Sequence, residues 1–260
     1  MMALLRAKRK RRKNLAGIGK FSTKAWATKR PTTRARVLLG KLARFVGFSA
    51  LALIGLFGGL VALYSVAPPV STLMIARLVE GRPYERVYVR LDDVSPAAVA
   101  AIVASEDATF CRNDGVDWGA LEEVLSRGGK RGPDRGASTI TMQTAKNLFL
   151  WPGRSIIRKG VEIGMSLALG KVWSKRRTME IYLNVAEWGD GVFGIEAASR
   201  RYFKKSAREL NLREGTALAT SLPNPFKRNP AHPTPFHRRL AAVVAARVIR
   251  NPELTSCLRR

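Results

Sequence analysis

Histidine and cysteine are both scarce in this sequence, with two of each among 260 residues. His232 and His237 lie in a proline-rich stretch, at a spacing that suits no common metal motif. The sequence therefore gives little support to a metalloenzyme or a histidine-dependent hydrolase. Cys111 and Cys257 are too few for a disulfide framework and are wrongly arranged for zinc. They could pair in an oxidising compartment, but their separation in the sequence favours two independent thiols.

Acidic residues are also in short supply, since 19 Asp and Glu face 46 Lys and Arg and leave a formal net charge of +27. Such an excess indicates an anionic partner, which could be nucleic acid, phospholipid head groups or a phosphorylated substrate. The hydrophobic content of 46% excludes a disordered chain and is enough to build one sizeable domain with appendages.

Charge of either sign is absent from residues 45–76, directly after a stretch, residues 1–44, with 15 basic residues and no acid. Its apolar part, residues 45–67, would span about 34 Å as a helix and could cross a membrane. A cleaved signal peptide is the competing interpretation, but the run is too long and Pro68 follows at once. We expect a retained anchor, with the basic tail in the cytoplasm and the chain from residue 68 outside it. Nucleic-acid binding by the basic tail is the less favoured alternative.

Beyond the anchor the pattern is mostly helical. The one predicted strand is Arg86–Leu91, whose side chains alternate in character. Helices are predicted from Ser95 to the Glu106–Asp107 pair, from Asp117, from Ser138, over 155–173, over 175–188, twice after Ser206, and from Phe236. In the helix over 155–173 the apolar stripe is predicted to comprise Ile157, Val161, Gly164, Ala168 and Val172. The glycine-rich basic stretch 127–138 is predicted to be a loop, with Ser138 capping the helix that follows.

With so few histidines, carboxylates are the natural acid–base groups. Glu106 ends an apolar helix, where partial burial would raise its pKa and make it a better general base near neutral pH. Glu162 is one helical turn after Arg158, so it could equally form an ordinary i,i+4 ion pair. Glu162 also borders the predicted apolar stripe. A charged side chain at that position is unexpected unless it has a function.

Four stretches in order, "EDATFCRNDG", "GASTITMQ", "RKGVE" and "KRRTMEIYLN", resemble the successive motifs of the family 51 peptidoglycan glycosyltransferases. The resemblance runs from Pro68 to the "LPNPFKRNP" stretch. It implies a mostly α-helical, lysozyme-like catalytic domain over residues 68–250, with a smaller membrane-proximal lobe and a C-terminal tail over 251–260. The implied substrate is lipid II, a disaccharide-peptide on a polyprenyl pyrophosphate.

The resemblance also implies roles for individual residues. Glu106 is expected to be the essential acid–base residue, and Glu162 to orient the pyrophosphate through a divalent cation, Mg or Mn, or through Arg158. Basic residues would neutralise the leaving group, Arg131 among them. The expected substrate-binding residues are Asp107, Phe110, Asn113, Lys130, Arg135, Ser138, Thr139, Gln143, Lys146, Arg158, Lys159 and Asn184. Asn113 and Met142 depart from the family pattern, in which a His and a Gln are usual.

The expected enzyme inverts the anomeric carbon and lengthens glycan strands in the bacterial inner membrane, with its catalytic domain in the periplasm. No Ser-x-x-Lys occurs, so a monofunctional protein is expected. The expected partners are lipid II, the growing glycan strand, membrane lipids and cell-wall synthesis or division proteins, without nucleic acid or an organic cofactor. Two alternatives stay open: a lysozyme-like lytic enzyme and a non-catalytic membrane scaffold.

Overall fold

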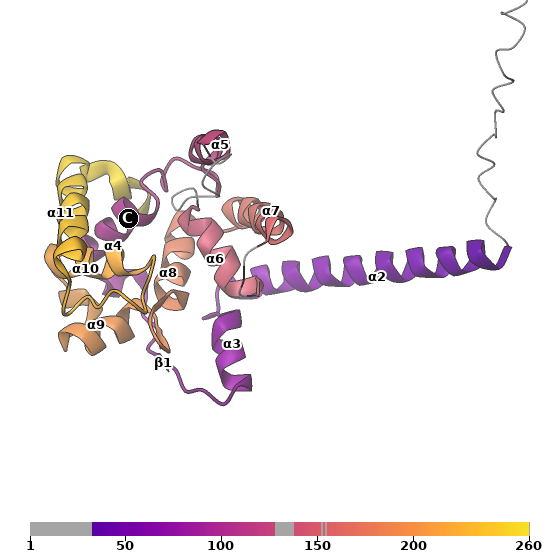
Figure 1. The fold of residues 1–260 in the computed structure, drawn as a ribbon, viewed down its shortest axis with the longest axis horizontal. Coiled ribbons are helices and arrows are strands. Elements are labelled where there is room, and N and C mark those ends of the chain that lie inside the picture. The colour runs from indigo at the N-terminus through magenta and orange to yellow at the C-terminus, as the bar shows by residue number, and fades with distance from the viewer. Residues whose placement is uncertain (1–32, 128–137, 152, 154, 260) are drawn as a thin grey trace, which may run out of the picture. The chain divides into compact units, whose positions relative to one another are not determined.

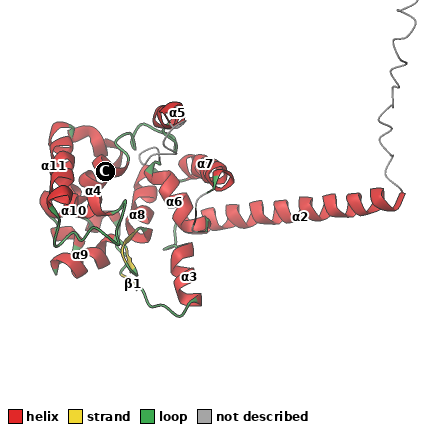
Figure 2. Ribbon diagram, viewed as in Figure 1, coloured by secondary structure: helices red, strands yellow, loops and turns green. Residues whose placement is uncertain are grey.

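The structure is a computed structural model that describes residues 33–127, 138–151, 153 and 155–259. The basic tail before residue 33 lies outside this range, as do Lys130, Arg131 and Arg135. The described part is mostly helical, with three short strands (Figures 1 and 2). The chain divides into two compact units, with the boundary inside the first helix, α2 (Thr33–Tyr64), between Leu53 and Ile54.

Helix α2 carries the predicted membrane anchor. Its segment Arg36–Tyr64 is the one stretch of the described residues that is long and apolar enough to cross a membrane, with mean hydropathy 2.2. Only 6% of its most apolar window is buried, as expected for a helix whose apolar faces meet lipid rather than protein. The predicted apolar segment 45–67 therefore belongs to a longer helix, which begins at Thr33 and ends before Ala67.

The last turns of α2 pack within the larger unit. Val61 is buried in a small cluster that includes Ile181 and Trp173, and the ring of Phe57 lies edge-on to Phe149. The Trp173 indole N–H donates to the Val61 carbonyl at 3.0 Å. The Val61 carbonyl also accepts from the Ser65 N–H at 3.1 Å, so the indole is its second donor and ties the last turns of α2 to the chain around Trp173.

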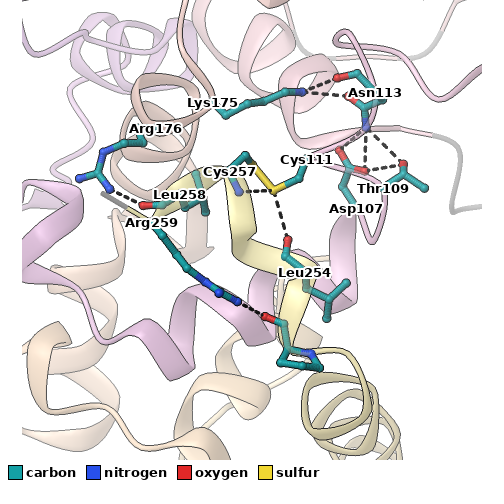
Figure 3. The surroundings of a disulfide bond; sticks show 11 residues. Asp107, Thr109, Cys111, Asn113, Lys175, Arg176, Leu254, Cys257, Leu258 and Arg259 are labelled. Atoms are coloured by element: carbon teal, nitrogen blue, oxygen red, sulfur yellow. Dashed lines mark hydrogen bonds between the residues drawn. A yellow bond between two sulfur atoms is a disulfide. The ribbon is translucent and has the colours of Figure 1, made fainter.

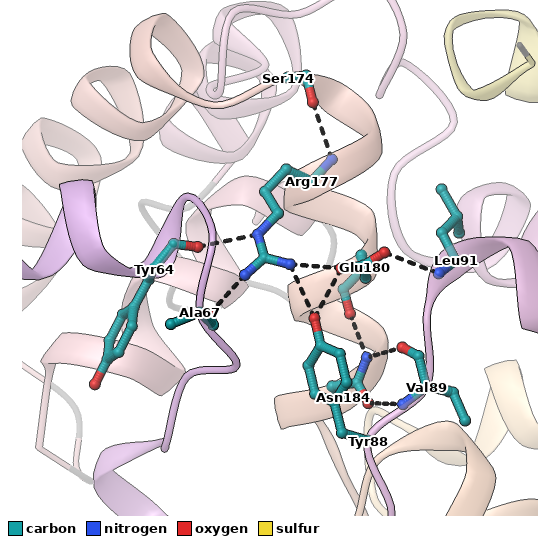
Figure 4. Close-up of polar contacts among 9 residues, drawn as sticks. All are labelled: Tyr64, Ala67, Tyr88, Val89, Leu91, Ser174, Arg177, Glu180 and Asn184. Atoms are coloured by element: carbon teal, nitrogen blue, oxygen red, sulfur yellow. Dashed lines mark hydrogen bonds and ion pairs between the residues drawn. The ribbon is translucent and has the colours of Figure 1, made fainter.

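Arg177 binds the end of α2 within the larger unit. Its guanidinium donates to the carbonyl oxygens of Tyr64 and Ala67, at 3.0 and 2.6 Å, and also to Glu180 and the Tyr88 hydroxyl (Figure 4). The guanidinium thus donates to two carbonyl oxygens at the end of the helix. Its remaining N–H groups pair with the acid Glu180. Arg177 therefore holds the backbone at the end of α2 and just after it.

The larger unit is built from helices. Their bounds are α3 (Thr72–Val79), α4 (Pro96–Glu106), α5 (Trp118–Arg127), α6 (Ile140–Phe149), α7 (Ile156–Val172), α8 (Lys175–Val185), α9 (Ile195–Phe203), α10 (Leu212–Ser221) and α11 (Pro235–Arg250), with 3₁₀ turns η1 (Leu91–Asp93), η2 (Ala207–Glu209) and η3 (Pro252–Leu258). The predicted helices are confirmed except for the first of the two after Ser206, where the chain forms only the 3₁₀ turn η2 before α10. Helices α3 and α9 were not predicted. Thr139, not Ser138, is the N-cap of α6, because its hydroxyl accepts from the Met142 N–H at 3.1 Å.

Helix α4 lies at the centre of the main core. It begins with Ser95 at the N-cap and Pro96 in the first turn, as predicted, and six of its residues are buried. Helix α10 packs closely on it, because Gly215 has no side chain: a Cβ there would lie 2.7 Å from the Cα of Ala98. This close approach brings the C-terminal ends of α4 and α10 together, where Ser105 Oγ lies 3.5 Å from the Ala219 carbonyl oxygen.

The sheet differs from the prediction. Its strands are β1 (Glu85–Arg86), β2 (Glu187–Gly189) and β3 (Val192–Phe193), in the order β1-β3-β2, with β1 parallel and β2 antiparallel to β3. The predicted strand over Arg86–Leu91 pairs only at its start, because Val89 instead bonds to an Asn184 side chain. The hairpin of β2 and β3 replaces the predicted end of the helix over 175–188. Gly191 supplies the positive φ, 72°, that the turn between the two strands requires.

Helix α7 turns its predicted apolar stripe outward, which corrects the sequence interpretation. Ile157 is 80% and Val172 60% exposed, and Val161 is 39% exposed. Its buried residues are Arg158, Glu162, Ser166 and Leu169. The stripe has helical periodicity, but the domain covers the opposite, more polar face of the same helix.

The two cysteines form a disulfide, so the prediction of two independent thiols is wrong. Cys111 and Cys257 are bonded across a sequence separation of 146, with Cα atoms 5.4 Å apart (Figure 3). The segment expected as a C-terminal tail, residues 251–260, includes η3, in which Leu258 is buried. Tertiary packing, which sequence spacing does not reveal, brings the two sulfur atoms together.

Candidate active site

Glu106 is the last residue of α4, and its partly buried carboxylate is held at both oxygens. Ser105 Oγ donates to Oε1 at 3.1 Å, and Gln143 Nε2 donates to Oε2 at 3.1 Å from α6. Burial raises the pKa of the Glu106 carboxyl, and these two hydrogen bonds and the charges of Lys146 and Arg228 oppose part of that rise. A carboxylate that is oriented and more basic than usual suits a general base.

Asp107 points elsewhere and holds the backbone around the base. Its carboxylate accepts from the Ile140 N–H at 3.0 Å, from Asn113 Nδ2 at 3.0 and 3.2 Å, and from Thr109 Oγ1 at 3.1 Å. Burial raises the pKa of Asp107, and these hydrogen bonds oppose the rise. The side chain thus ties the end of α4 to the first turn of α6, where the helix dipole favours an acid.

The turn after Asp107 is fixed by internal contacts. Phe110 is fully buried in the main core, with the Lys175 ammonium 4.7 Å from its ring centroid. Asn113 donates to Asp107 and accepts from the Gly115 N–H and from Lys175 Nζ. Asn113, which stands where the family usually has His, therefore makes its hydrogen bonds within the turn and to Lys175. Phe110 reaches no surface on which it could contact a substrate directly.

Glu162 lies among three basic side chains. It is 2% exposed, and its two oxygens accept from Arg158 Nη1 at 3.3 Å and from Lys159 Nζ at 2.6 Å. The ordinary ion pair expected with Arg158 is present, but it is buried, so removing one partner would leave an uncompensated charge. Arg158 is also buried, and its Nε has no hydrogen-bond partner among the described residues.

The charges of both carboxylates, Glu106 and Glu162, act on Lys146. It follows Gln143 by three residues on α6, so both side chains lie on the same face of that helix. Burial lowers the pKa of Lys146, as do the charges of Arg158 and Lys159, whereas Glu162 and Glu106 raise it. Three cations around one acid leave this part of the site positively charged, as an anionic ligand requires.

The second motif is placed around this cluster. Ser138 Oγ accepts from Lys159 Nζ at 2.7 Å, whereas the Thr139 hydroxyl is buried and donates to the Gly115 carbonyl at 2.6 Å. Gln143 joins the base to the rest of the site, because its amide oxygen accepts from the Tyr182 hydroxyl at 3.2 Å. Met142 is fully buried. It therefore fills the core at the position where the family usually has a Gln.

Asn184 is not brought to this site. Its side chain is fully buried and makes hydrogen bonds to both the N–H and the carbonyl of Val89, at 2.9 and 2.8 Å, and to the Glu180 carbonyl (Figure 4). All of its polar groups are therefore used to hold the segment after β1. The geometry gives Asn184 a structural role instead of the expected contact with substrate.

Two residues near Glu106 were missed by the sequence analysis. Tyr182 is fully enclosed, and burial together with the charges of Glu106 and Asp107 raises its pKa well above the usual range, so its hydroxyl stays protonated and can donate to Gln143. Arg228 lies in the "LPNPFKRNP" stretch, which was noted without a role for its arginine. Helical spacing from the motif could have indicated Tyr182, whereas nothing local in the sequence indicates Arg228.

The described side chains offer few ligands for the expected divalent cation. Both oxygens of Glu162 are taken by basic side chains, and the described residues contain no group of three His, Cys, Asp or Glu that could hold a metal. A hard cation such as Mg²⁺ needs several oxygen ligands. The protein side chains of this part of the chain do not supply them.

The fold and site define a class of protein: a mostly helical, lysozyme-like domain next to a helix able to cross a membrane, with one oriented carboxylate beside a cationic cluster. The transglycosylase family model matches residues 72–248. The chain belongs to this family. It is 49% identical over 191 residues to a biosynthetic peptidoglycan transglycosylase of Brucella suis, covering 74% of this chain and 85% of that protein.

Two further relatives carry the same description. The protein of Rhodospirillum centenum is 46% identical over 224 residues, covering 85% of this chain and 96% of the relative. That of Rhizobium meliloti is 46% identical over 237 residues, covering 90% and 97%. The similarity thus extends over most of the length of this chain and of its relatives.

Proposed function

We propose that this chain polymerises lipid II into glycan strands, with inversion at the anomeric carbon and release of polyprenyl pyrophosphate. It is a peptidoglycan glycosyltransferase of cell-wall synthesis, as its family and its relatives indicate. The observation that supports the detailed reaction best is the pairing of one basic carboxylate, Glu106, with a cluster of cations around Glu162.

Glu106 would act as the general base. The attacking sugar hydroxyl forms a bond from its oxygen to the anomeric carbon, its proton passes to the carboxylate, and the bond from that carbon to the pyrophosphate oxygen breaks. Gln143 and Ser105 hold the two carboxylate oxygens during this transfer. Because the nucleophile and the leaving group lie on opposite faces of the same carbon, the configuration inverts.

The cationic cluster would bind the leaving group. Pyrophosphate leaves as an anion and needs neutralisation of charge more than protonation. Lys146, Arg158 and Lys159 converge on one acid, so the cluster retains the excess positive charge that this role requires. A lytic enzyme would instead need a proton donor for a neutral leaving sugar, and the cluster would serve no purpose in that reaction. A non-catalytic scaffold would need neither the oriented base nor the cluster.

The expected Mg²⁺ or Mn²⁺ would have to be held mainly by the oxygens of the substrate's pyrophosphate, since the described side chains do not provide a complete set of ligands. No step of the proposed reaction depends on it. Polymerisation that survives chelation with EDTA would remove the cation from the proposal.

The membrane would supply the substrate. We propose a single-pass protein of the inner membrane, with the chain before α2 in the cytoplasm and the catalytic domain in the periplasm. Ile157 of the outward apolar stripe of α7 is 80% exposed, the adjacent Ile156 is 92% exposed, and Trp151 is 59% exposed. Lipid is the partner that would cover such residues in a protein anchored beside them.

The test is polymerisation of lipid II by the purified full-length protein. Glu106→Gln keeps the size and hydrogen-bonding capacity of the side chain but removes the base, so it should abolish strand elongation while lipid II still binds. Asp107→Asn should be less severe, because Asp107 holds the turn and does not meet the reacting hydroxyl. Glu122→Gln, an exposed acid on α5, is the matched control and should behave as wild type. Substantial elongation by the Glu106→Gln protein would overturn the assignment of the base.

A further inference from the structure

Arg228 is held at the C-terminal end of α10, and its charge acts on the Glu106 carboxylate. Its Nη1 donates to the carbonyl of Thr220, in the last turn of α10, at 2.7 Å, and its guanidinium lies 5.9 Å from the ring centroid of Phe236. A cation at the C-terminal end of a helix is favoured by the helix dipole. Among the described residues Arg228 makes no ion pair with an acid. Its positive charge is therefore not neutralised by a direct contact.

The C-terminal end of α10 places Arg228 and Glu106 together. Ser105 Oγ lies 3.5 Å from the carbonyl oxygen of Ala219, and Arg228 donates to that of Thr220, the next residue along α10. Ser105 also donates to Glu106 Oε1. The carboxylate therefore has its Oε1 side toward the α10 terminus and its Oε2 side toward Gln143 of α6.

We propose that Arg228 is a positioning residue that keeps the Glu106 carboxylate ionised as the proton acceptor of the glycosyl transfer. The inference rests on the proposed function. It assigns to Arg228 a task that the other nearby cation cannot perform throughout the reaction. Lys146 belongs to the cluster around Glu162, and a pyrophosphate bound there would neutralise its charge at the moment when Glu106 must accept a proton.

The remaining groups around Glu106 do not supply this charge. Tyr182 of α8 stays protonated and neutral, since burial and the neighbouring acids raise its pKa. Arg247 of α11 donates to the Ala104 carbonyl at 3.3 Å and lies along the backbone of α4. Asp107, the adjacent acid, has its carboxylate directed to α6 and Asn113.

The residues that hold Arg228 add no competing charge. His237 is buried, and its Nε2 lies 2.8 Å from Thr220 Oγ1. Burial lowers the pKa of His237, the hydrogen bond to the Ala217 carbonyl opposes part of that fall, and the charge of Arg228 lowers the pKa further, which favours the neutral ring. The charges of Arg228 and Lys146 both lower the pKa of Glu106 against the effect of burial. Arg228 is the member of this pair that lies outside the pyrophosphate cluster.

The experiment measures kcat and KM for lipid II with the full-length protein, from about pH 5 to 9, for Arg228→Gln and Arg228→Lys. In the Arg228→Gln protein a larger share of Glu106 is protonated at the acid end. Its kcat should fall there by roughly threefold or more and approach wild type at the alkaline end, with KM nearly unchanged. Arg228→Lys keeps the charge and should restore most of the loss. Lys227→Gln removes the neighbouring exposed cation and should match wild type.

Three results would overturn the inference. They are a fall in kcat of the same size at every pH, an effect confined to KM, which would make Arg228 a substrate ligand, and no effect at all. A thermal melt of each variant separates loss of folding from loss of base function, and the Lys variant keeps the test decisive if Arg228→Gln unfolds. Failure of the wild-type protein itself to polymerise lipid II would instead contradict the proposed function.

Discussion

Loss of the disulfide between Cys111 and Cys257 should destabilise the catalytic domain strongly. The bond closes a loop with a sequence separation of 146, and the chain-entropy model gives about 5 kcal/mol for a loop of that length. Observed losses of native disulfides usually fall at about 2–5 kcal/mol, so we expect a loss of about 4 kcal/mol for the Cys111→Ala/Cys257→Ala protein. In a domain of this size that lowers the Tm by roughly 8–16 °C.

The assay is thermal unfolding of the purified protein in detergent, with and without a dithiol reductant. Wild type with reductant should melt near the double variant, and the double variant should not respond to reductant. Alkylation of unreduced wild type should label neither cysteine. Efficient labelling without reductant, or a Tm that reduction leaves unchanged, would refute the reasoning.

Loss of the disulfide should also affect the turn that follows Glu106. Cys111 lies between Phe110 and Asn113, in the turn that follows the base, and Cys257 lies in η3 (Figure 3). Removing the bond frees η3 from that turn but leaves the contacts of Asp107 in place. Activity at low temperature should therefore be reduced less than stability.

The remaining predictions concern the site and the membrane. Glu162→Gln should lower turnover by orders of magnitude. Because that acid is buried between two cations, the change should also cost about 3–5 kcal/mol of stability, measured by denaturant unfolding; near-normal polymerisation would favour a purely structural ion pair. The pH profile of kcat should lose activity as pH falls through the raised pKa of Glu106, because protonation removes the base. Its acid limb should lie above that of an ordinary glutamate, and activity that persists unchanged into strong acid would contradict this. A reporter fused after Arg260 should be active only outside the cytoplasm, and cytoplasmic activity would reverse the proposed orientation.

Local sequence patterns determined much of this protein. The cap and first turn of α4 follow from Ser95 and Pro96, and Glu106 lies at the end of that helix as the pattern predicts. The spacing of Arg158 and Glu162 placed them on one helical face, where they do pair. The uncharged run predicted a helix long enough to cross a membrane. These features depend on residues a few positions apart, whose relation is set by the backbone period.

Tertiary structure alone decided the rest. Which face of α7 is buried, whether Cys111 meets Cys257, and which side chains hold the carboxylate of Glu106 depend on how separate elements pack. The sequence carried an apolar stripe on α7, yet a surface that faces lipid and a core that faces protein favour the same residues. Contacts between residues far apart in the chain leave no periodic signal, so only the folded structure could bring Gln143 into contact with the base and hold Arg228 at the end of α10.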